Sequence, residues 1–382
     1  MYNVLTLNKI AAVGTSRLGD NYSYGDDVKN PDAILVRSAA MHDMEFESNL
    51  LAIARAGAGT NNIPKDKCSE QGIVVFNTPG ANANAVKELV LAGLLMSSRK
   101  IVEGIEWAKT LKGNGDAVGK MVEKGKSQFV GPEIKGKTLG VIGLGAIGIL
   151  VANAAVTLGM DVIGFDPFMS VPNALKLDPA VKLMKNNEEV MTNCDYLTIH
   201  VPLTTDTKDL VDADMIAKMK DGVRIMNFSR DGLVNSTAVL EAVKSGKVAK
   251  YVTDFGTDDI LGEENIICMP HLGASTPESE DNCAVMACDQ VKEYLENGNI
   301  INSVNYPAIS LPRSGDTRFC VMHKNVPELL KNVLAELNGN VENMLSKSRG
   351  DYAYTIIDVA GADKADADKI SAVDGVIRVR AL

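Results

Sequence analysis

The stretch Gly143-Leu144-Gly145-Ala146-Ile147-Gly148 carries the strongest structural information in this 382-residue chain. Before it, Thr138–Ile142 is a short apolar run typical of a buried strand, and after it an apolar segment through Leu158 predicts a helix. The next buried strand is predicted over Asp161–Asp166. A strand, a glycine turn and a helix in this order favour a parallel α/β sheet.

The three glycines have the spacing of a dinucleotide-binding turn. Gly143 permits the tight turn, Gly145 lets the backbone approach a pyrophosphate, and Gly148 lets the helix pack close to the sheet. The start of the helix offers free N–H groups to the phosphates. The predicted cofactor contacts of the turn are Gly143, Gly145, Ala146, Ile147 and Gly148. Asp166 ends the next strand, where a carboxylate accepts hydrogen bonds from a ribose diol and repels a 2′-phosphate, so the predicted cofactor is NAD.

Composition excludes several classes of protein. The chain has a net charge of -10 and no block of lysine and arginine, which argues against a nucleic-acid partner. No apolar run reaches the ~18 residues of a membrane span, and the N-terminus lacks a signal-peptide pattern. The six cysteines show no C-x-x-C spacing, so we expect reduced thiols, no metal site and a cytoplasmic location.

The rest of the chain continues the alternation of strands and helices. Further strands are predicted over Ala33–Val36, Leu51–Ala54, Ile73–Phe76, Tyr196–Val201, Val223–Asn227, Tyr251–Asp254 and Ile266–Met269. One or two long helices are predicted from Ala83 to Thr110, a surface loop over residues 112–136, and a helix over Glu278–Glu296. A loop with Pro307, Pro312 and Gly315 predicts a linker. Beyond it, strands at Phe319–His323, Tyr352–Val359 and Val376–Val379, with a helix at Val326–Leu337, indicate a separate β-α-β-β-α-β module.

Several motifs resemble those of the D-isomer-specific 2-hydroxyacid dehydrogenases over nearly the whole chain. Besides the glycine turn, they are Val36-Arg37-Ser38, Arg55–Gly59, Asn77–Asn82, Asn227–Arg230 and Pro270–Thr276. The resemblance implies a Rossmann-type doubly wound NAD domain inserted into a flavodoxin-like substrate domain, and a C-terminal α+β ferredoxin-like module. We expect the substrate domain at 1–95 and 284–310, the NAD domain at 96–283 and the module at 317–382.

The resemblance also implies the catalytic residues. His271 is the expected base that removes the hydroxyl proton, and Arg230 is the cation that holds the carboxylate. Relatives carry glutamate and proline shortly after an aspartate-valine-phenylalanine run, whereas this chain has Asp254-Phe255-Gly256-Thr257-Asp258-Asp259. Asp259 is the expected partner of His271, with Asp258 as the alternative, and Asp254 is expected to meet the nicotinamide carboxamide.

The substrate contacts follow from the same resemblance. Arg37 and Ser38 are expected at the substrate phosphate, and the N–H groups of Gly57, Ala58 and Gly59 at its carboxylate. Asn82 is expected to contact the substrate, and Val86 to pack beside the nicotinamide.

Residues 317–382 resemble an ACT domain, a small amino-acid-binding regulatory module. His323, Asn325 and Asn340 match the serine contacts of serine-inhibited relatives, and a structural or dimerising role is the alternative. Such modules pair side by side, so a homodimer or homotetramer is expected.

The expected function is NAD-dependent oxidation of 3-phosphoglycerate to 3-phosphohydroxypyruvate, which begins serine biosynthesis. One alternative is a dehydrogenase for glycerate, hydroxypyruvate, lactate or another small D-2-hydroxy acid. An alternative of another class is an NAD-sensing binding protein.

Overall fold

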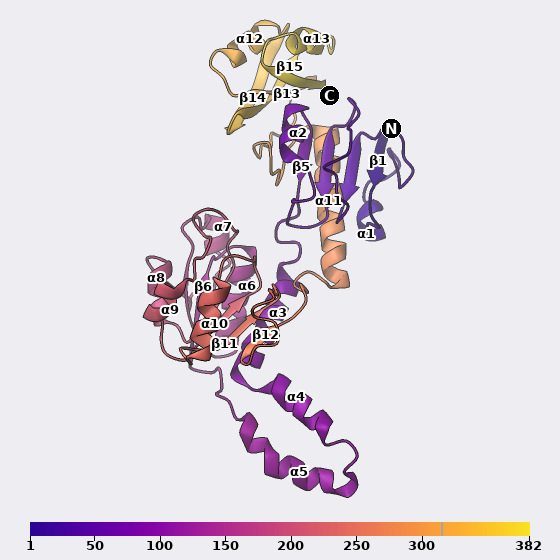
Figure 1. The fold of residues 1–382 in the computed structure, drawn as a ribbon. Helices are drawn as coiled ribbons and strands as arrows, with labels where there is room; N and C mark the ends of the chain where they lie inside the picture. Colours follow the sequence, from indigo (N-terminus) through magenta and orange to yellow (C-terminus); the bar gives the residue numbers. More distant parts are fainter. Residues whose placement is uncertain (315) are drawn as a thin grey trace. The chain divides into compact units, whose positions relative to one another are not determined.

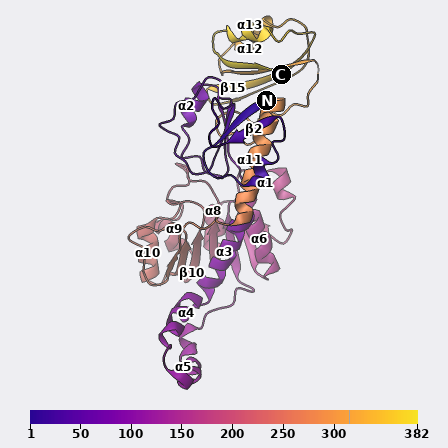
Figure 2. The same cartoon turned by 90° about the vertical axis from the view of Figure 1, so that its right-hand side faces the viewer.

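The computed structural model describes residues 1–314 and 316–382, and the chain divides into two compact units (Figure 1). Unit 1 comprises Met1–Asn82 with Pro277–Leu382, and unit 2 comprises Ala83–Thr276. These limits differ from the predicted limits at residues 95/96 and 283/284. Helix α3 (Ala83–Ser98) packs against α6 (Ala146–Thr157) within unit 2 (Figure 2), and α11 (Pro277–Asn297) packs within unit 1, so neither helix is divided.

Unit 2 is built on a seven-stranded parallel sheet with the order β12-β11-β10-β9-β6-β7-β8. Its strands are β6 (Thr138–Ile142), β7 (Asp161–Phe165), β8 (Lys182–Leu183), β9 (Tyr196–Ile199), β10 (Val223–Asn227), β11 (Val248–Thr253) and β12 (Ile266–Cys268). The strand order reverses at β6, which has β7 on one side and β9 on the other. This is the order of a doubly wound sheet, and the predicted Rossmann-type fold is confirmed.

Helices cover both faces of that sheet. The remaining helices of unit 2, outside its arm, are α7 (Val171–Ala174), α8 (Asn187–Asn193), α9 (Ala213–Lys218) and α10 (Ser236–Lys244). One core cluster joins Val190, Ile216 and Val239 from α8, α9 and α10 to the sheet. A second cluster joins Val90 of α3 and Ile149 of α6 to it. Strands buried on both faces read as continuous apolar runs, and this explains why the sequence identified them.

A helical arm leaves unit 2 between α3 and β6. It contains α4 (Ile101–Thr110), η1 (Gly115–Ala117), α5 (Val118–Gly125) and η2 (Lys126–Phe129). The prediction of a surface loop over residues 112–136 was therefore wrong. The glycines and lysines there concealed a short helix, and the ring of Trp107 packs on Phe129 with centroids 5.2 Å apart. Neither α4 nor α5 buries a residue fully.

Unit 1 contains a five-stranded parallel sheet with the order β2-β1-β3-β4-β5, as expected for a flavodoxin-like domain. Its elements are β1 (Tyr2–Thr6), α1 (Ala12–Thr15), β2 (Tyr22–Gly25), β3 (Ala33–Val36), β4 (Ala52–Arg55), α2 (Lys65–Glu70) and β5 (Val74–Phe76), followed after unit 2 by α11. Helix α11 packs along this sheet, and its Val291, Tyr294 and Leu295 are completely buried.

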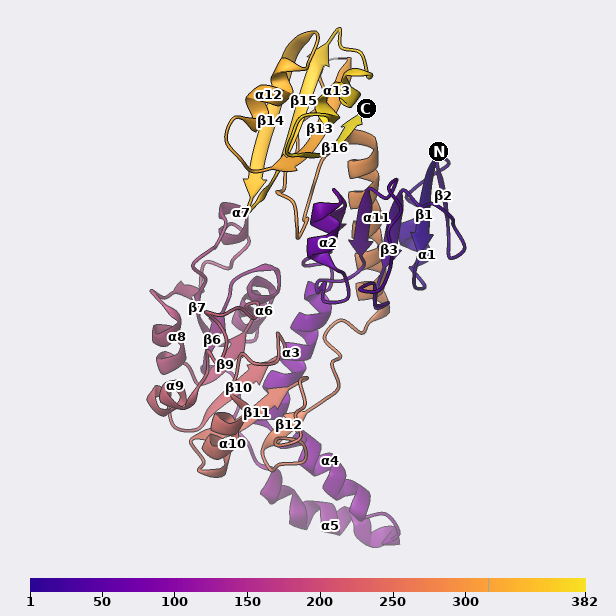
Figure 3. The ribbon, with the colours of Figure 1, turned by 45° about the horizontal axis from the view of Figure 1, so that its top comes forward.

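The C-terminal residues of unit 1 form a four-stranded antiparallel sheet with the order β14-β15-β13-β16. Its elements are β13 (Thr317–Lys324), α12 (Leu329–Ala335), β14 (Asn340–Arg349), β15 (Tyr352–Ala360), α13 (Asp366–Ser371) and β16 (Val376–Ala381). Both helices lie on one face of the sheet (Figure 3). The predicted β-α-β-β-α-β fold is confirmed, and we call residues 317–382 the C-terminal module.

The C-terminal module is not a separate body, contrary to the expectation. Cys320, Met322, Tyr354 and Ile356 belong to the same core cluster as Tyr294 of α11. Polar contacts reinforce this packing at the carboxyl end of α11. Arg380 donates to the carbonyls of Tyr294 and Leu295 at 3.0 and 2.7 Å, and the Tyr354 hydroxyl donates to that of Gly298 at 2.7 Å.

The predicted linker is also packed. Tyr306 is fully buried, and Ile300 and Ile309 form an antiparallel bridge across the loop that holds Pro307. Gly315 of the predicted linker lies outside the described residues.

Candidate functional site

The glycine turn lies between β6 and α6, at the point where the strand order of unit 2 reverses. Gly143 has φ 87°, and a Cβ there would lie 2.6 Å from the His200 carbonyl oxygen. A Cβ on Gly148 would overlap the carbonyl oxygen of Gly143. At Gly145 a Cβ would enter open space, so its absence leaves room for a ligand rather than for the protein. This cradle, with Ala146 and the following residues at the start of α6, fits a dinucleotide pyrophosphate.

Asp166 follows β7 beside the turn. Its carboxylate accepts hydrogen bonds from the backbone N–H of Leu144 at 2.9 Å and of Phe168 at 2.8 Å. These bonds fix the carboxylate at the edge of the cradle, where the sequence places the ribose contact.

Arg230 lies in a loop after β10, and the Asn227 side chain at the end of β10 stabilises this loop through hydrogen bonds. The buried amide of Asn227 donates to the Arg230 carbonyl at 2.9 Å and accepts from the Ser229 N–H at 3.2 Å. The Ser229 hydroxyl donates to the Val201 carbonyl at 2.9 Å. The loop is thus braced through its backbone while the Arg230 side chain stays exposed.

Asp254, directly after β11, is a buried carboxylate beside His271. Its Oδ2 accepts a hydrogen bond from the Gly273 N–H at 3.3 Å, whereas its buried Oδ1 has no partner among the described residues. Burial raises the pKa of the Asp254 carboxyl, and the nearby charges of His271 and Arg230 partly offset that rise. The His271 ring packs against Phe255 in a tilted arrangement, with centroids 4.8 Å apart. The structure therefore brings Asp254, His271 and Arg230 into one electrostatic group.

Val86 of α3 lies next to Asp254 and the loop of His271. A Cβ built on Gly273 would lie 3.4 Å from Val86 Cγ2 and 3.5 Å from Asp254 Oδ2. These three residues surround one small volume, where the sequence places the nicotinamide.

Asp259 lies in the same loop region but is engaged elsewhere. Its carboxylate accepts a hydrogen bond from the Thr257 hydroxyl at 2.5 Å, and this bond, with another from Ser236, lowers its pKa. No hydrogen bond joins Asp259 or Asp258 to His271 in the described part of the chain. The assignment of Asp259 as the partner of His271 stays a prediction.

In unit 1, Arg37 and Ser38 follow β3 in a loop that Asn8 organises. Asn8 Oδ1 accepts hydrogen bonds from the N–H groups of Arg37, Ser38 and Ala39 at 2.9, 2.9 and 3.1 Å. The Arg37 guanidinium pairs with Glu280 of α11 at 2.5 Å. Sequence reasoning missed Asn8, whose only signal is its position two residues after a parallel strand.

The loop of Gly57, Ala58 and Gly59 is braced in a similar way. Arg55 donates to the carbonyls of Arg37 (2.9 Å) and Gly59, and Asn77 donates to that of Ala58 at 2.7 Å. The Gly57 N–H, which was also predicted at the substrate carboxylate, instead donates to the Arg55 carbonyl at 2.9 Å. Among the described residues, no hydrogen bond occupies the N–H groups of Ala58 and Gly59, so both remain available to an anion. Asn82 lies in the turn that ends the first segment of unit 1.

The three predicted effector residues do not meet within one chain. His323 is buried and bonds to the Lys324 carbonyl at 2.8 Å and the Thr355 hydroxyl at 2.9 Å, and burial lowers its pKa. Asn325 follows β13 at the end where Lys324 pairs with Tyr352. Asn340 pairs with Ala360 at the opposite end of the sheet.

Among the described residues, no group of three or more histidine, cysteine, aspartate or glutamate side chains is placed to hold a metal ion. No membrane-spanning helix is found in residues 1–314 and 316–382. The six cysteines are free thiols.

Known proteins share this sequence and fold. Residues 91–273 match the NAD-binding domain of the D-isomer specific 2-hydroxyacid dehydrogenases. A D-3-phosphoglycerate dehydrogenase of Haemophilus influenzae is 31% identical over 89% of this chain and 83% of its own length. One from Methanocaldococcus jannaschii is 32% identical over 84% of this chain, which spans only 60% of that protein.

Solved structures agree on the fold. The apo D-mandelate dehydrogenase of Rhodotorula graminis has a TM-score of 0.68 at 21% identity, over 82% of this chain and 99% of its own. A cofactor (NAD+)-bound 3-phosphoglycerate dehydrogenase of Entamoeba histolytica has a TM-score of 0.60 at 24% identity, over 80% and 98%. From its sequence match and its architecture, the chain belongs to the D-isomer-specific 2-hydroxyacid dehydrogenase family.

Proposed function

We propose that this protein is an NAD-dependent dehydrogenase that oxidises 3-phosphoglycerate to 3-phosphohydroxypyruvate, the first step of serine biosynthesis. One observation supports the chemistry above the others: the loop of His271 meets the buried Asp254 carboxylate, whose Oδ2 accepts a hydrogen bond from the Gly273 N–H at 3.3 Å, and Arg230 follows the neighbouring strand β10. The substrate is supported by the relatives named D-3-phosphoglycerate dehydrogenase.

In this proposal His271 removes the proton of the substrate hydroxyl, and Arg230 binds the substrate carboxylate through its planar fork. When the imidazole takes up that proton, a neighbouring carboxylate stabilises the new positive charge. Asp259 is the carboxylate that the sequence predicts, and Asp254 is the one beside the ring. NAD, bound at the turn of Gly143 and held at its ribose by Asp166, would accept the hydride.

The residues of unit 1 complete the proposal. We assign the substrate phosphate to the region of Arg37 and Ser38, and the carboxylate to the free N–H groups of Ala58 and Gly59. Asn82 is proposed as a further substrate contact.

The test is NADH formation with 3-phosphoglycerate, glycerate and lactate. Wild type should prefer the phosphorylated acid, and His271→Asn should lower kcat by about 10²–10⁴-fold. His42→Asn is the matched control, because His42 is exposed and its ring bonds to no group but the Asn61 carbonyl within residues 1–314 and 316–382. Near-normal turnover by His271→Asn would refute the mechanism, and equal use of the three acids would refute the substrate.

We also propose a homodimer or homotetramer whose subunits meet on the arm. Ile101, Ile105 and Val122 of the arm, and Val130 directly after it, leave 36–74% of their surface exposed, and a second copy would cover this apolar surface. Ile105→Glu should then lower the molar mass in sedimentation, whereas an unchanged mass would contradict the proposal.

Serine remains the proposed effector of the C-terminal module. Because Asn325 and Asn340 lie at opposite ends of its sheet, a serine site that contains both residues needs two copies of the module.

A further inference from the structure

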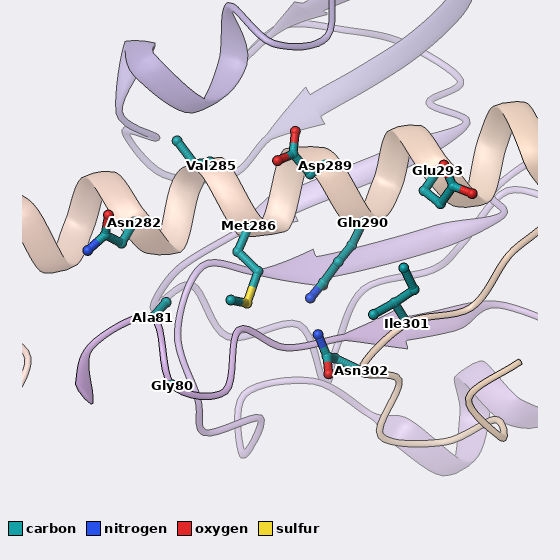
Figure 4. Close-up of a pocket in the computed structure, with 10 residues that line it drawn as sticks. All are labelled: Gly80, Ala81, Asn282, Val285, Met286, Asp289, Gln290, Glu293, Ile301 and Asn302. Atoms are coloured by element: carbon teal, nitrogen blue, oxygen red, sulfur yellow. The ribbon is translucent and has the colours of Figure 1, made fainter. Parts of the chain in front are cut away.

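Two cavities of unit 1 differ in the charges of the residues that line them. The larger, about 690 Å³, lies beside α11, with Asp289, Gln290 and Glu293 on its wall (Figure 4). In the described part of the chain no lysine, arginine or histidine lines it. Arg17 pairs with Asp289 at 2.6 Å, and Glu293 adds a further carboxylate, so this lining offers an anionic ligand no unpaired cation and does not suit a phosphorylated substrate.

The smaller cavity, about 520 Å³, lies at the carboxyl ends of β1 and β2. Its polar lining includes Thr6, Asn8, Lys9, Thr15 and Asp26. The order β2-β1-β3-β4-β5 reverses at β1, because the chain goes from β1 to β2 on one side and then to β3 on the other. In open parallel sheets, ligands bind outside the carboxyl ends of the strands at such a reversal.

Asn8 connects this cavity to the predicted phosphate loop. It lines the cavity, and its Oδ1 accepts the N–H groups of Arg37, Ser38 and Ala39. Three successive N–H groups are an anion-binding arrangement, but here the amide oxygen of Asn8 already fills it. A phosphate near this loop must therefore be held by side chains rather than by these backbone groups.

The two arginines near the loop offer less charge than the sequence suggests. Glu280 neutralises Arg37 at 2.5 Å, and Arg55 is bonded to the backbone carbonyls of Arg37 and Gly59. Lys9 is exposed and forms no ion pair in the described part of the chain, even though Asp26 lines the same cavity. In a protein of net charge -10, a dianionic phosphate needs such an uncompensated cation nearby.

We propose that Lys9 is a phosphate-binding residue, and that it determines the preference of this enzyme for a phosphorylated 2-hydroxy acid. The ligand class is a phosphate monoester, whose dianion lies in the cavity of Thr6, Asn8 and Thr15. This inference rests on the proposed function, and it adds a contact that the family motifs do not contain.

The experiment measures kcat and KM for Lys9→Met, which keeps the apolar stem and removes the charge. KM for 3-phosphoglycerate should rise about tenfold with kcat little changed, as expected for the loss of one charged hydrogen bond made equally in ground and transition states. Turnover of glycerate should stay as in wild type. Lys9→Arg should restore most of the affinity, and Lys29→Met, an exposed lysine outside the cavity, should behave as wild type.

A second measurement is independent of turnover. Inorganic phosphate should raise the thermal midpoint of wild type and of Lys29→Met, but not that of Lys9→Met. The proposal would be overturned if Lys9→Met raised KM equally for 3-phosphoglycerate and glycerate. It would also be overturned if inorganic phosphate still raised the thermal midpoint of Lys9→Met. If wild type shows no preference for 3-phosphoglycerate, the proposed function fails, and the phosphate-protection measurement alone decides whether Lys9 forms an anion site.

Discussion

Replacing Arg318 with methionine is expected to lower the free energy of unfolding of unit 1 by about 3–5 kcal/mol, because it leaves a buried carboxylate without its counterion. Arg318 and Asp358 are both fully buried and form a bidentate pair at 2.6 and 2.8 Å. The remaining donors of Arg318 bond the carbonyls of Asn297 and Leu311 at 2.9 and 3.0 Å. Methionine fills much of the same space, so the loss is electrostatic rather than a cavity.

The second partner provides the control. Arg318→Met with Asp358→Leu removes both charges, and such a replacement often costs far less than breaking the pair. The double variant should therefore be more stable than Arg318→Met alone. Ser314 donates to Asp358 through its N–H and its hydroxyl, so recovery should be incomplete.

The effect should also depend on pH. Burial opposes ionisation of Asp358, but its bonds to Arg318 outweigh burial, so its pKa is lowered in the folded protein. Its stabilising contribution is present above the unfolded value of about 3.9 and is lost as pH falls through the folded value. The difference in the free energy of unfolding between wild type and Arg318→Met should therefore become smaller as the pH is lowered.

The assay is urea unfolding followed by far-UV circular dichroism, with hydrogen exchange of the β13 and β15 amides to locate the loss. Tryptophan fluorescence is unsuitable, because the single tryptophan, Trp107, lies in the arm of unit 2. The reasoning would be refuted if Arg318→Met lowered the free energy of unfolding by less than about 1 kcal/mol. It would also be refuted if the double variant were no more stable than Arg318→Met.

Three further outcomes are expected. Gly148→Ala should weaken NAD binding by at least about tenfold in calorimetry, since its Cβ would overlap the Gly143 carbonyl; unchanged affinity would contradict the tight helix–turn packing. Asp254→Asn should lower kcat more than Asp259→Asn, because Asp254 is the buried carboxylate beside the loop of His271. A larger loss of kcat for Asp259→Asn would restore the sequence prediction. Burial lowers the pKa of His200 to about 3, so His200 takes up a proton in the unfolded chain at a higher pH than in the folded protein. The free energy of unfolding should therefore fall as pH drops below about 6.5. His200→Gln should make the urea midpoint less dependent on pH in this range, and an unchanged pH dependence would exclude His200 as the cause.

The parts of the fold that depend on local pattern were predictable. The strand before Gly143, the helix after it and Asp166 at the next strand end all follow from spacing within about 25 residues, which parallel sheets repeat. The arm helix at Val118–Gly125 was missed, because a short segment rich in glycine and lysine carries little apolar periodicity.

The candidate site was predictable in its residues more than in their partners. Arg230 and His271 follow the parallel strands β10 and β12, at the end where such sheets place their functional loops, and the structure puts both near one carboxylate. Which carboxylate it is depends on a hydrogen bond from Thr257 that turns Asp259 elsewhere. Asn8 contacts a loop nearly 30 residues away in the chain, and no single-sequence pattern encodes such a pairing.

Helix α11 connects the C-terminal module mechanically to the parallel sheet of unit 1. It begins at Pro277, the first residue of unit 1 after unit 2. Arg318 and Arg380 bond its final carbonyls, and Tyr354 bonds that of Gly298, directly after the helix. Its 21 residues make a rod about 31 Å long. A tilt of about one degree imposed at the clamped end would move the far end by about 0.5 Å. Because α11 also packs along the parallel sheet of unit 1, such a tilt would have to carry that sheet with it, and the C-terminal module and the sheet would move together.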